Sequence, residues 1–252
     1  MTHKIALITG ASRGLGRNAA LHLAAAGIDI IGTYRSQADE ARAVAAEIQQ
    51  RGGRALMLPL DVADSASFGA FAQQIGDGLR SHFGRDRFDF LLNNAGIGIH
   101  AAFAETTEAQ FDQLLNIQFK GPFFLTQALL PLIADGGRIL NVSTGLTRFA
   151  LPGYGAYAAM KGAMEVLTRY QAKELGARGI GVNIIAPGAI ETDFGGGLVR
   201  DNAEINRQIA SNTALGRVGL PDDIGGAIAM LFADGSRWIN GQRIEASGGM
   251  FL

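Results

Sequence analysis

The chain has 252 residues, of which 48% are hydrophobic, so it has enough apolar material for a large core and is not a disordered protein. Its formal net charge is -1 with no block of like charges, which argues against nucleic acid or an anionic membrane surface as the main partner and favours a small molecule. The absence of cysteine excludes disulfides, thiol catalysis and cysteine-ligated metals.

The first part of the chain alternates between strand-forming and helix-forming runs. An apolar run leads into a glycine-rich turn, and the alanine- and leucine-rich run after it favours a helix that ends at Gly27. The order then repeats, with β-branched runs followed by apolar residues at helical spacing. Strands are expected at 5–9, 28–34, 54–62 and 88–96, and helices at 16–27, 37–53 and 65–79, the last with Asp64 or Ser65 as its N-cap.

The alternation continues to the end of the chain. Helices are expected at 107–134, at 154–176 and after Pro221, and strands at 137–143, 181–188 and 241–248. Successive βα units predict a parallel sheet with right-handed crossovers. No linker or change of composition marks a boundary, so the prediction is one doubly wound α/β domain over residues 1–252, with about seven strands flanked by helices.

One stretch, 190–215, does not fit the alternation. It contains three consecutive glycines, Gly195 to Gly197, among polar residues. This composition favours a mobile flap over a binding site. The alternative is an ordinary surface loop.

The turn between the first strand and the first helix, "TGASRGLG", places glycine at positions 10, 14 and 16. Glycine lets backbone N–H groups approach a pyrophosphate closely, and the helix N-terminus adds a partial positive charge. The position of the turn favours a dinucleotide site. The alternative is a glycine-rich turn that binds no ligand.

The end of the second strand indicates which dinucleotide is bound. NAD-binding chains usually carry an acidic residue there, but residues 32–36 of this chain read Gly-Thr-Tyr-Arg-Ser. Arg35 and Arg13, with a hydroxyl from Thr33 or Ser36, would form a cationic pocket suited to a 2'-phosphate. NADP(H) is therefore the predicted cofactor.

Three acidic residues leave alternatives open. Asp39 and Glu40 follow the second strand closely, so use of NAD(H) stays an alternative. Asp61, at the end of the third strand, either accepts a hydrogen bond from the adenine amino group or serves as a turn or cap residue.

Ligands of a doubly wound sheet lie beyond the carboxyl ends of its strands. The residues that follow the fourth, fifth and sixth strands are therefore expected around one crevice; they are Asn93, Asn94, Ala95 and Gly96, then Ser143 and Thr144, then Pro187 and Gly188. Tyr157 and Lys161, four residues apart on the next helix, share one face of it with Cβ atoms about 5–6 Å apart.

This pair suits acid/base chemistry. A phenol has a pKa of about 10, so stabilising the phenolate at neutral pH requires about 4 kcal/mol. A lysine ammonium and a nicotinamide positive charge would supply most of it in a desolvated site. Tyr157 would then protonate a carbonyl oxygen as hydride arrives. The alternative is a tyrosine that packs on the stem of Lys161.

Five motifs, "TGASRGLG", "NNAG", "YAAMK", "VNIIAPGAIETD" and "WINGQRIEASGG", stand in the order and spacing of the short-chain dehydrogenase/reductase family, which the chain resembles along its whole length. The resemblance implies a Rossmann-type fold, a nicotinamide cofactor and a catalytic tetrad. In that tetrad Asn116 of "LLNIQF" steadies a relay water with Lys161, which also binds the nicotinamide ribose, and Tyr157 is the acid/base. The segment from Pro187 to Thr192 would bind the carboxamide, with Ile190 by backbone and Thr192 by hydroxyl.

The expected cofactor contacts therefore come from every strand end of the crevice. They are Gly10, Ser12, Arg13, Gly14, Leu15, Gly16, Tyr34, Arg35, Ser36, Asp61, Val62, Asn93, Ala95, Gly96, Tyr157, Lys161, Pro187, Gly188, Ile190 and Thr192.

The sequence departs from the family pattern at the catalytic hydroxyl. The family usually has serine thirteen residues before the tyrosine, and this chain has Thr144 there, with Ser143 one place earlier. Successive strand residues point to opposite faces, so the two hydroxyls are not equivalent. Thr144 is the expected donor to the carbonyl; the alternative is a local shift that lets Ser143 act.

The expected activity is NADP(H)-preferring interconversion of a carbonyl and an alcohol, similar to 3-oxoacyl-[acyl-carrier-protein] reductases, with a generic ketone or aldehyde equally permitted. The alternative from another class is a catalytically silent nucleotide-binding sensor or scaffold. Four further side chains, His100, Phe103, Phe149 and Tyr154, either line the substrate pocket or pack in the core.

Partners and location follow from what the sequence lacks and from the resemblance. The histidines have no metal-ligand spacing, and no run approaches the 18 to 20 apolar residues of a membrane span, so a soluble, cytoplasmic protein without a metal is expected. The run 119–132 is apolar on several sides, which suggests a subunit interface. Proteins similar to this one usually form homotetramers.

Overall fold

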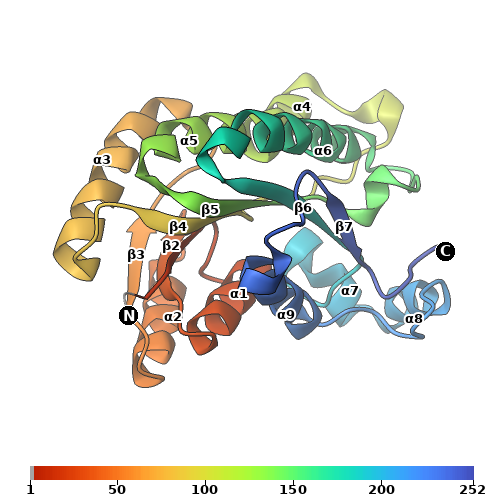
Figure 1. Ribbon diagram of the computed structural model, residues 1–252. Helices are drawn as coiled ribbons and strands as arrows, with labels where there is room; N and C mark the ends of the chain where they lie inside the picture. Colours follow the sequence, from red (N-terminus) through yellow and green to blue (C-terminus); the bar gives the residue numbers. More distant parts are fainter. Residues whose placement is uncertain (1–2) are drawn as a thin grey trace.

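The computed structural model describes residues 3–252 and contains one seven-stranded parallel sheet with the strand order β3-β2-β1-β4-β5-β6-β7 (Figure 1). The strands are β1 Ile5–Ile8, β2 Asp29–Tyr34, β3 Ala55–Pro59, β4 Phe88–Asn93, β5 Ile133–Val142, β6 Gly181–Pro187 and β7 Arg243–Ala246. The order reverses between β1 and β4, and such a switch point opens a crevice at the carboxyl ends of the strands. The predicted single Rossmann-like α/β domain is confirmed.

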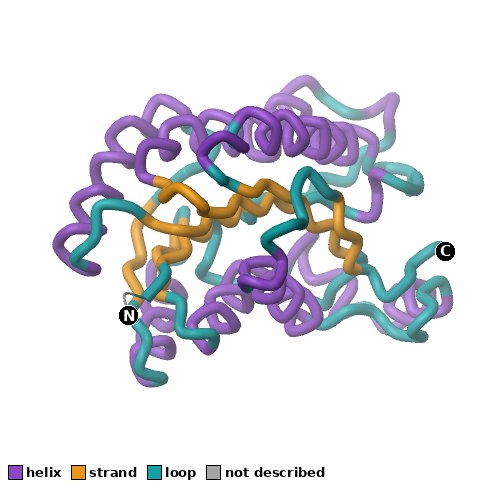
Figure 2. The backbone as a smooth tube through the Cα atoms, viewed as in Figure 1, coloured by secondary structure: helices purple, strands orange, loops and turns teal. Residues whose placement is uncertain are grey.

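Helices cover both faces of the sheet, and Figure 2 shows the strands as one layer between them. One face carries α1 Gly14–Ala25, α2 Ala38–Gln50 and α9 Pro221–Phe232; the other carries α3 Phe68–Gly78, α4 Glu108–Leu115, α5 Gly121–Leu129 and α6 Gly155–Glu174 (Figure 1). Alternate strand residues feed the two cores. In β1, Ile5 and Leu7 belong to one buried cluster, and Ala6 and Ile8 belong to the other.

The helix expected at 107–134 is divided into shorter pieces. It starts with a capping box in which Thr107 accepts from the Gln110 N–H, and it continues from α4 through a π-helical turn at Asn116–Lys120 into α5. A 3-10 turn at Leu130–Leu132 contains Pro131, which ends the helix, so β5 begins four residues earlier than expected.

The segment 190–215 contains two short helices, α7 Leu198–Asp201 and α8 Ala203–Ser211. The side chain of Asn202 caps α8, and β-bridges join the segment to the rest of the domain at both ends, between Ile190 and Gly219 and between Thr213 and Met250. The sequence analysis did not predict these two helices; α8 forms after the glycines because the side chain of Asn202 caps its first turn. Within residues 3–252 no helix is both long and apolar enough to cross a membrane.

Candidate active site

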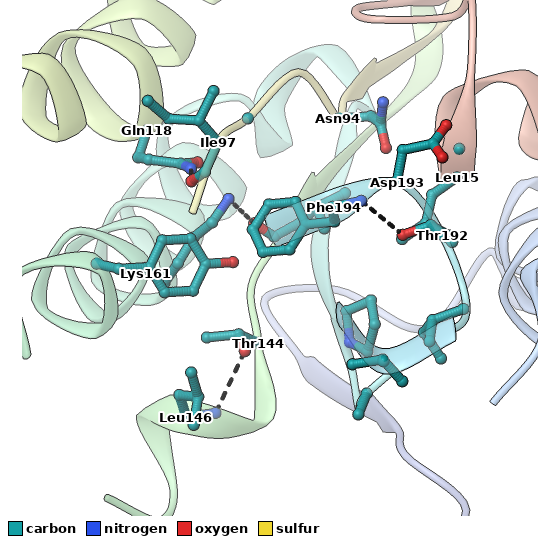
Figure 3. Close-up of a pocket in the computed structure, with 18 of the residues that line it drawn as sticks. Leu15, Asn94, Ile97, Gln118, Thr144, Leu146, Lys161, Thr192, Asp193 and Phe194 are labelled. Carbon is teal, nitrogen blue, oxygen red and sulfur yellow. Dashed lines mark hydrogen bonds between the residues drawn. The ribbon is translucent and has the colours of Figure 1, made fainter. Parts of the chain in front are cut away.

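A cavity of about 670 Å³ opens at the carboxyl ends of the central strands. Its walls come from the glycine turn after β1, the ends of β2, β4, β5 and β6, the N-terminal half of α6, and the segment 190–215 (Figure 3). This is the crevice that the strand order predicts. Of the predicted site residues, all line the cavity except Gly16, Asn93 and Asn116.

The glycine turn leaves room for a phosphate group. Gly10 and Gly14 have φ values of +68° and +54°, which favour glycine, and a Cβ at Gly16 would lie 2.1 Å from the carbonyl oxygen of Gly10. Gly16 is therefore needed for the close packing of α1 against the backbone of Gly10, and it does not line the cavity. No side chain caps α1 and no acid lies in its first turn, so its N-terminal N–H groups and partial positive charge suit a pyrophosphate.

Two arginines line the nucleotide end of the cavity. Arg13 and Arg35 are both exposed there, whereas the nearby Arg17 and Arg42 are paired with Glu47 and Asp39. No carboxylate in residues 3–252 forms an ion pair with Arg13 or Arg35. The cavity wall therefore offers two uncompensated guanidinium groups to an anionic ligand.

Two neighbouring polar residues hold this end together. The Thr33 hydroxyl accepts a hydrogen bond from the N–H of Gly10 at 3.2 Å, so it supports the glycine turn. Asp61 lines the cavity while it accepts from the N–H of Ala63 at 2.9 Å, so the turn role considered for it is present.

Asn93 lies in the interior of the domain, contrary to the prediction. Its amide donates to Thr126 at 3.0 Å and to the Asn141 Oδ1 at 2.9 Å, and Asn141 donates in turn to Thr168 at 2.9 Å. Asn94, the next residue, lines the cavity, and its amide donates to the carbonyl oxygen of Thr9 at 2.9 Å. Because adjacent residues of an extended chain point to opposite sides, only one of the two asparagines can reach the crevice.

The predicted acid/base pair is buried in the middle of the cavity wall. Tyr157 is 6% exposed and Lys161 is 5% exposed, and both lie on α6. The Lys161 Nζ lies 5.9 Å from the centre of the Tyr157 ring and donates to the carbonyl oxygen of Val142, at the end of β5, at 2.8 Å. The hydrogen bond fixes the ammonium side chain close to the phenol.

Burial controls the charge of both groups. It raises the pKa of Tyr157 above the usual value for a phenol, with a smaller opposing effect from a hydrogen bond to Thr144, so the phenol carries its proton. Burial also lowers the pKa of Lys161 to about 7. The phenol of the protein alone is therefore harder to ionise than the sequence suggested, because desolvation outweighs the hydrogen bond to Thr144. A protonated phenol is the form that can donate a proton to a carbonyl oxygen.

The lowered pKa of Lys161 predicts a pH-dependent stability. Unfolded lysine keeps its proton up to about pH 10.4, so from pH 7 to 10 the unfolded chain binds more protons and the free energy of unfolding rises with pH. We expect the melting temperature of the cofactor-free protein to rise more steeply from pH 7 to 9 than that of Lys161→Met, as measured by circular dichroism. Parallel curves for the two proteins would contradict a lowered pKa.

The two hydroxyls after β5 point to different partners. The buried Ser143 hydroxyl donates to the Glu165 carboxylate at 2.5 Å, and Thr147 and Arg243 bind the same carboxylate oxygen. The Thr144 hydroxyl accepts from the Leu146 N–H at 3.3 Å and lies close enough to Tyr157 to affect its pKa (Figure 3). The geometry thus brings Thr144, and not the hydroxyl of Ser143, to the phenol.

The carboxamide at the cavity comes from a different residue than expected. Asn116 does not line the cavity, but Gln118 does, and it is 1% exposed. Its Nε2 donates to the carbonyl oxygen of Ile97, while its Oε1 has no partner in residues 3–252. The π-helical turn at Asn116–Lys120 rotates the following side chains relative to their positions in a regular α-helix. The regular helix that was predicted for this run does not include this rotation.

The other half of the cavity is rich in apolar and aromatic side chains. Three of the four side chains considered for the substrate pocket line this half, namely His100, Phe149 and Tyr154. The fourth, Phe103, is 96% exposed and lies outside the cavity. Sequence reasoning missed a further set of lining residues, namely Phe194, Leu198, Val199, Ile205, Ile209, Met250 and Phe251. The helical spacing of Ile205 and Ile209 was a usable signal, but Phe251 is placed by tertiary contacts alone.

Comparisons with known proteins cover nearly the whole chain. A family model described as enoyl-(acyl carrier protein) reductase matches residues 10–251. Tetrahydroxynaphthalene reductase PfmaG of Pestalotiopsis fici is 35% identical over 257 residues, which cover 98% of this chain and 91% of that protein.

Two solved structures superpose closely. One is the promiscuous reductase LugOII, which catalyses keto-reduction at C1 during lugdunomycin biosynthesis, with a TM-score of 0.94, 38% identity and coverage of 100% of this chain and 98% of that one. The other is the angucycline C-6 ketoreductase LanV with bound NADP, with a TM-score of 0.93, 37% identity and coverage of 99% and 96%.

Proposed function

Because the chain belongs to the short-chain dehydrogenase/reductase family and is an oxidoreductase of carbonyl and alcohol groups, we propose that it is an NADP(H)-preferring ketone or aldehyde reductase with Tyr157 as the acid/base. The observation that carries the proposal is the cluster of the buried Tyr157 and Lys161 with the half-buried Thr144 at one wall of the cavity. The family model is described by an enoyl substrate, but the similar proteins PfmaG, LugOII and LanV are named as reductases of ketone or naphthol compounds.

In the proposed reaction each of the three residues acts on the carbonyl oxygen or on the phenol. The Thr144 hydroxyl donates a hydrogen bond to the carbonyl oxygen and polarises the C=O bond. Tyr157 transfers its phenolic proton to that oxygen as it becomes an alkoxide, and recovers the proton from the alcohol in the reverse direction. Lys161, held by Val142, stabilises the phenolate by its charge when protonated. The nicotinamide, when bound, supplies or accepts the hydride.

We assign the carboxamide of the relay to Gln118 in place of Asn116. The Oε1 of Gln118 is a buried acceptor without a partner in residues 3–252, and it lies at the cavity. A buried acceptor of this kind is costly unless a ligand or a water donates to it.

The preference for NADP(H) is supported by charge at the nucleotide end. Arg13 and Arg35 line the cavity without a carboxylate partner, and Ser36 lies beside them on the same wall. A 2'-phosphate would bind there through charge-assisted hydrogen bonds. The similar LanV binds NADP.

A fluorescence titration with NADPH and NADH tests the cofactor preference. We expect NADPH to bind at least about tenfold tighter, which corresponds to about 1.4 kcal/mol. Arg35→Ala should weaken NADPH binding by about tenfold or more and leave NADH binding nearly unchanged, because only the 2'-phosphate loses its partner. The matched control is Arg42→Ala, which removes an exposed arginine that pairs with Asp39 outside the cavity. Equal affinities of the wild-type protein for both cofactors would refute the preference.

The homotetramer implied by the resemblance remains a proposal. It is supported by apolar and aromatic side chains that are exposed on the helices of one face, Phe111, Phe124, Val166 and Tyr170, on α4, α5 and α6. Large exposed apolar patches usually mark interaction surfaces.

A further inference from the structure

The substrate half of the cavity is built from aromatic rings. Five of them form what we call the aromatic wall, consisting of Phe149, Tyr154, Tyr157, Phe194 and Phe251. Adjacent ring centres are 4.6 Å apart for Phe149 and Phe251, 6.5 Å for Tyr154 and Tyr157, and 5.9 Å for Tyr157 and Phe194. The rings come from the loop after β5, from α6, from the segment 190–215 and from the C-terminal residues. They therefore meet only in the folded chain.

Apart from Lys161 beside Tyr157, the charged side chains that line the cavity in the described residues lie away from the aromatic wall or are paired. Arg13, Arg35 and Asp61 lie at the nucleotide end, Asp193 is paired with Arg200 at 2.5 Å, and the Lys161 amine donates to a backbone carbonyl. Within residues 3–252, no unpaired arginine or further lysine lines the cavity near the aromatic wall. Lys161 lies beside Tyr157, but its amine donates to the carbonyl oxygen of Val142, so a substrate carboxylate or phosphate would lose its hydration there without a free cation to pair with.

Phe194 occupies a special place in the aromatic wall. Its backbone N–H donates to the Thr192 hydroxyl at 3.2 Å, and Gly195 after it has a φ of +62°, so the ring is held at the start of a tight turn. A Cβ at position 98 would lie only 2.8 Å from the ring, so the absence of a side chain at Gly98 makes room for Phe194. Figure 3 shows the Phe194 ring between Lys161 and Thr192, and the ring is still 46% exposed. The centre of the ring lies 5.9 Å from the centre of the Tyr157 ring, on the same wall of the cavity.

A substrate that reaches the Tyr157 hydroxyl must therefore lie against Phe194 or displace it. A flat aromatic ring that lies against Phe194 contacts its face or edge and can contact a second ring of the aromatic wall, whereas a saturated or short aliphatic ketone gains no aromatic contact. We propose that this reductase selects uncharged aromatic ketones, and that Phe194 is the residue that determines this specificity. The inference rests on the proposed carbonyl reductase function.

The test compares two ketones and three variants with NADPH. The ketones are 1-tetralone, a bicyclic aromatic ketone, and cyclohexanone, which presents its carbonyl in a saturated ring. We expect kcat/KM for 1-tetralone to exceed that for cyclohexanone by at least about tenfold, as two aromatic contacts would give. Phe194→Leu keeps an apolar side chain but removes the ring, so it should remove most of this preference through a higher KM for 1-tetralone. Phe194→Tyr should restore the preference, and Phe103→Leu, outside the cavity, should not change it.

Calorimetry of 1-tetralone binding to the NADP-loaded protein gives a second readout that does not depend on turnover. Binding should weaken in Phe194→Leu and persist in Phe194→Tyr. Equal kcat/KM values for the two ketones in the wild-type protein, or equal losses on both in Phe194→Leu, would overturn the inference and leave the reductase function standing. If a protein that binds NADPH reduces neither ketone nor a simple aldehyde, the proposed function itself fails, and the inference fails with it.

Discussion

Replacing Tyr157 with Phe is expected to lower kcat for NADPH-dependent carbonyl reduction by about a hundredfold to ten-thousandfold, the usual contribution of a positioned general acid. The substitution removes one hydroxyl and keeps the ring, which packs with Leu114 and Met160 in a buried cluster. Folding and cofactor binding should therefore change little. Steady-state kinetics and an NADPH titration on the same preparation separate the two effects.

The matched control for this experiment is Tyr170→Phe. Tyr170 lies on the same helix, α6, but is 64% exposed and outside the cavity, so its hydroxyl should not affect kcat. If Tyr157→Phe turned over substrate at the wild-type rate, Tyr157 would not be the proton donor. If the wild-type protein bound NADPH but reduced no carbonyl compound, a catalytically silent sensor or scaffold would become the better description.

The second large effect is expected at Thr144. Thr144→Val keeps the branched shape but removes the hydroxyl, and loss of one hydrogen-bond donor to a developing oxyanion typically lowers kcat by about a hundredfold to a thousandfold. Thr144→Ser retains the donor and should retain most of the rate. The kinetic measurement is the same as for Tyr157.

Ser143→Ala distinguishes the two adjacent hydroxyls. The Ser143 hydroxyl donates to Glu165 at 2.5 Å, so its removal should lower the melting temperature more than it lowers kcat. A loss of kcat in Ser143→Ala as large as in Thr144→Val would assign the catalytic hydroxyl to Ser143.

Much of the fold and part of the site could be predicted because they depend on local sequence. The repeated βα pattern predicts a parallel sheet, and the carboxyl ends of parallel strands place Thr144, Pro187 and the glycine turn around one crevice. Alternation along a strand also predicted that Ser143 and Thr144 face different partners, as their hydrogen bonds show.

The differences from the sequence analysis arise where geometry departs from regular periodicity or depends on distant residues. Asn116, expected from a family pattern, does not line the cavity, whereas the π-helical turn presents Gln118 to it. Asn93 was expected in the crevice, but the last residue of β4 faces the interior. Phe251 reaches the cavity through its contact with Phe149, about a hundred residues earlier in the chain, which no local pattern encodes.

The interior position of Asn93 has a consequence for how the chain finds its fold. Asn93 and Asn141 are opposite each other in the pairing of β4 with β5, and their amides form a chain that ends at Thr168 on α6. If β4 slid by one residue, the hydrophobic runs of both strands would still be buried, but these amides would lose their partners at roughly 1–3 kcal/mol each. Apolar strands tolerate several alignments, whereas two facing amides tolerate one. We therefore expect the two asparagines to fix the register of β4 against β5, and their replacement by leucine to produce a less uniquely folded sheet.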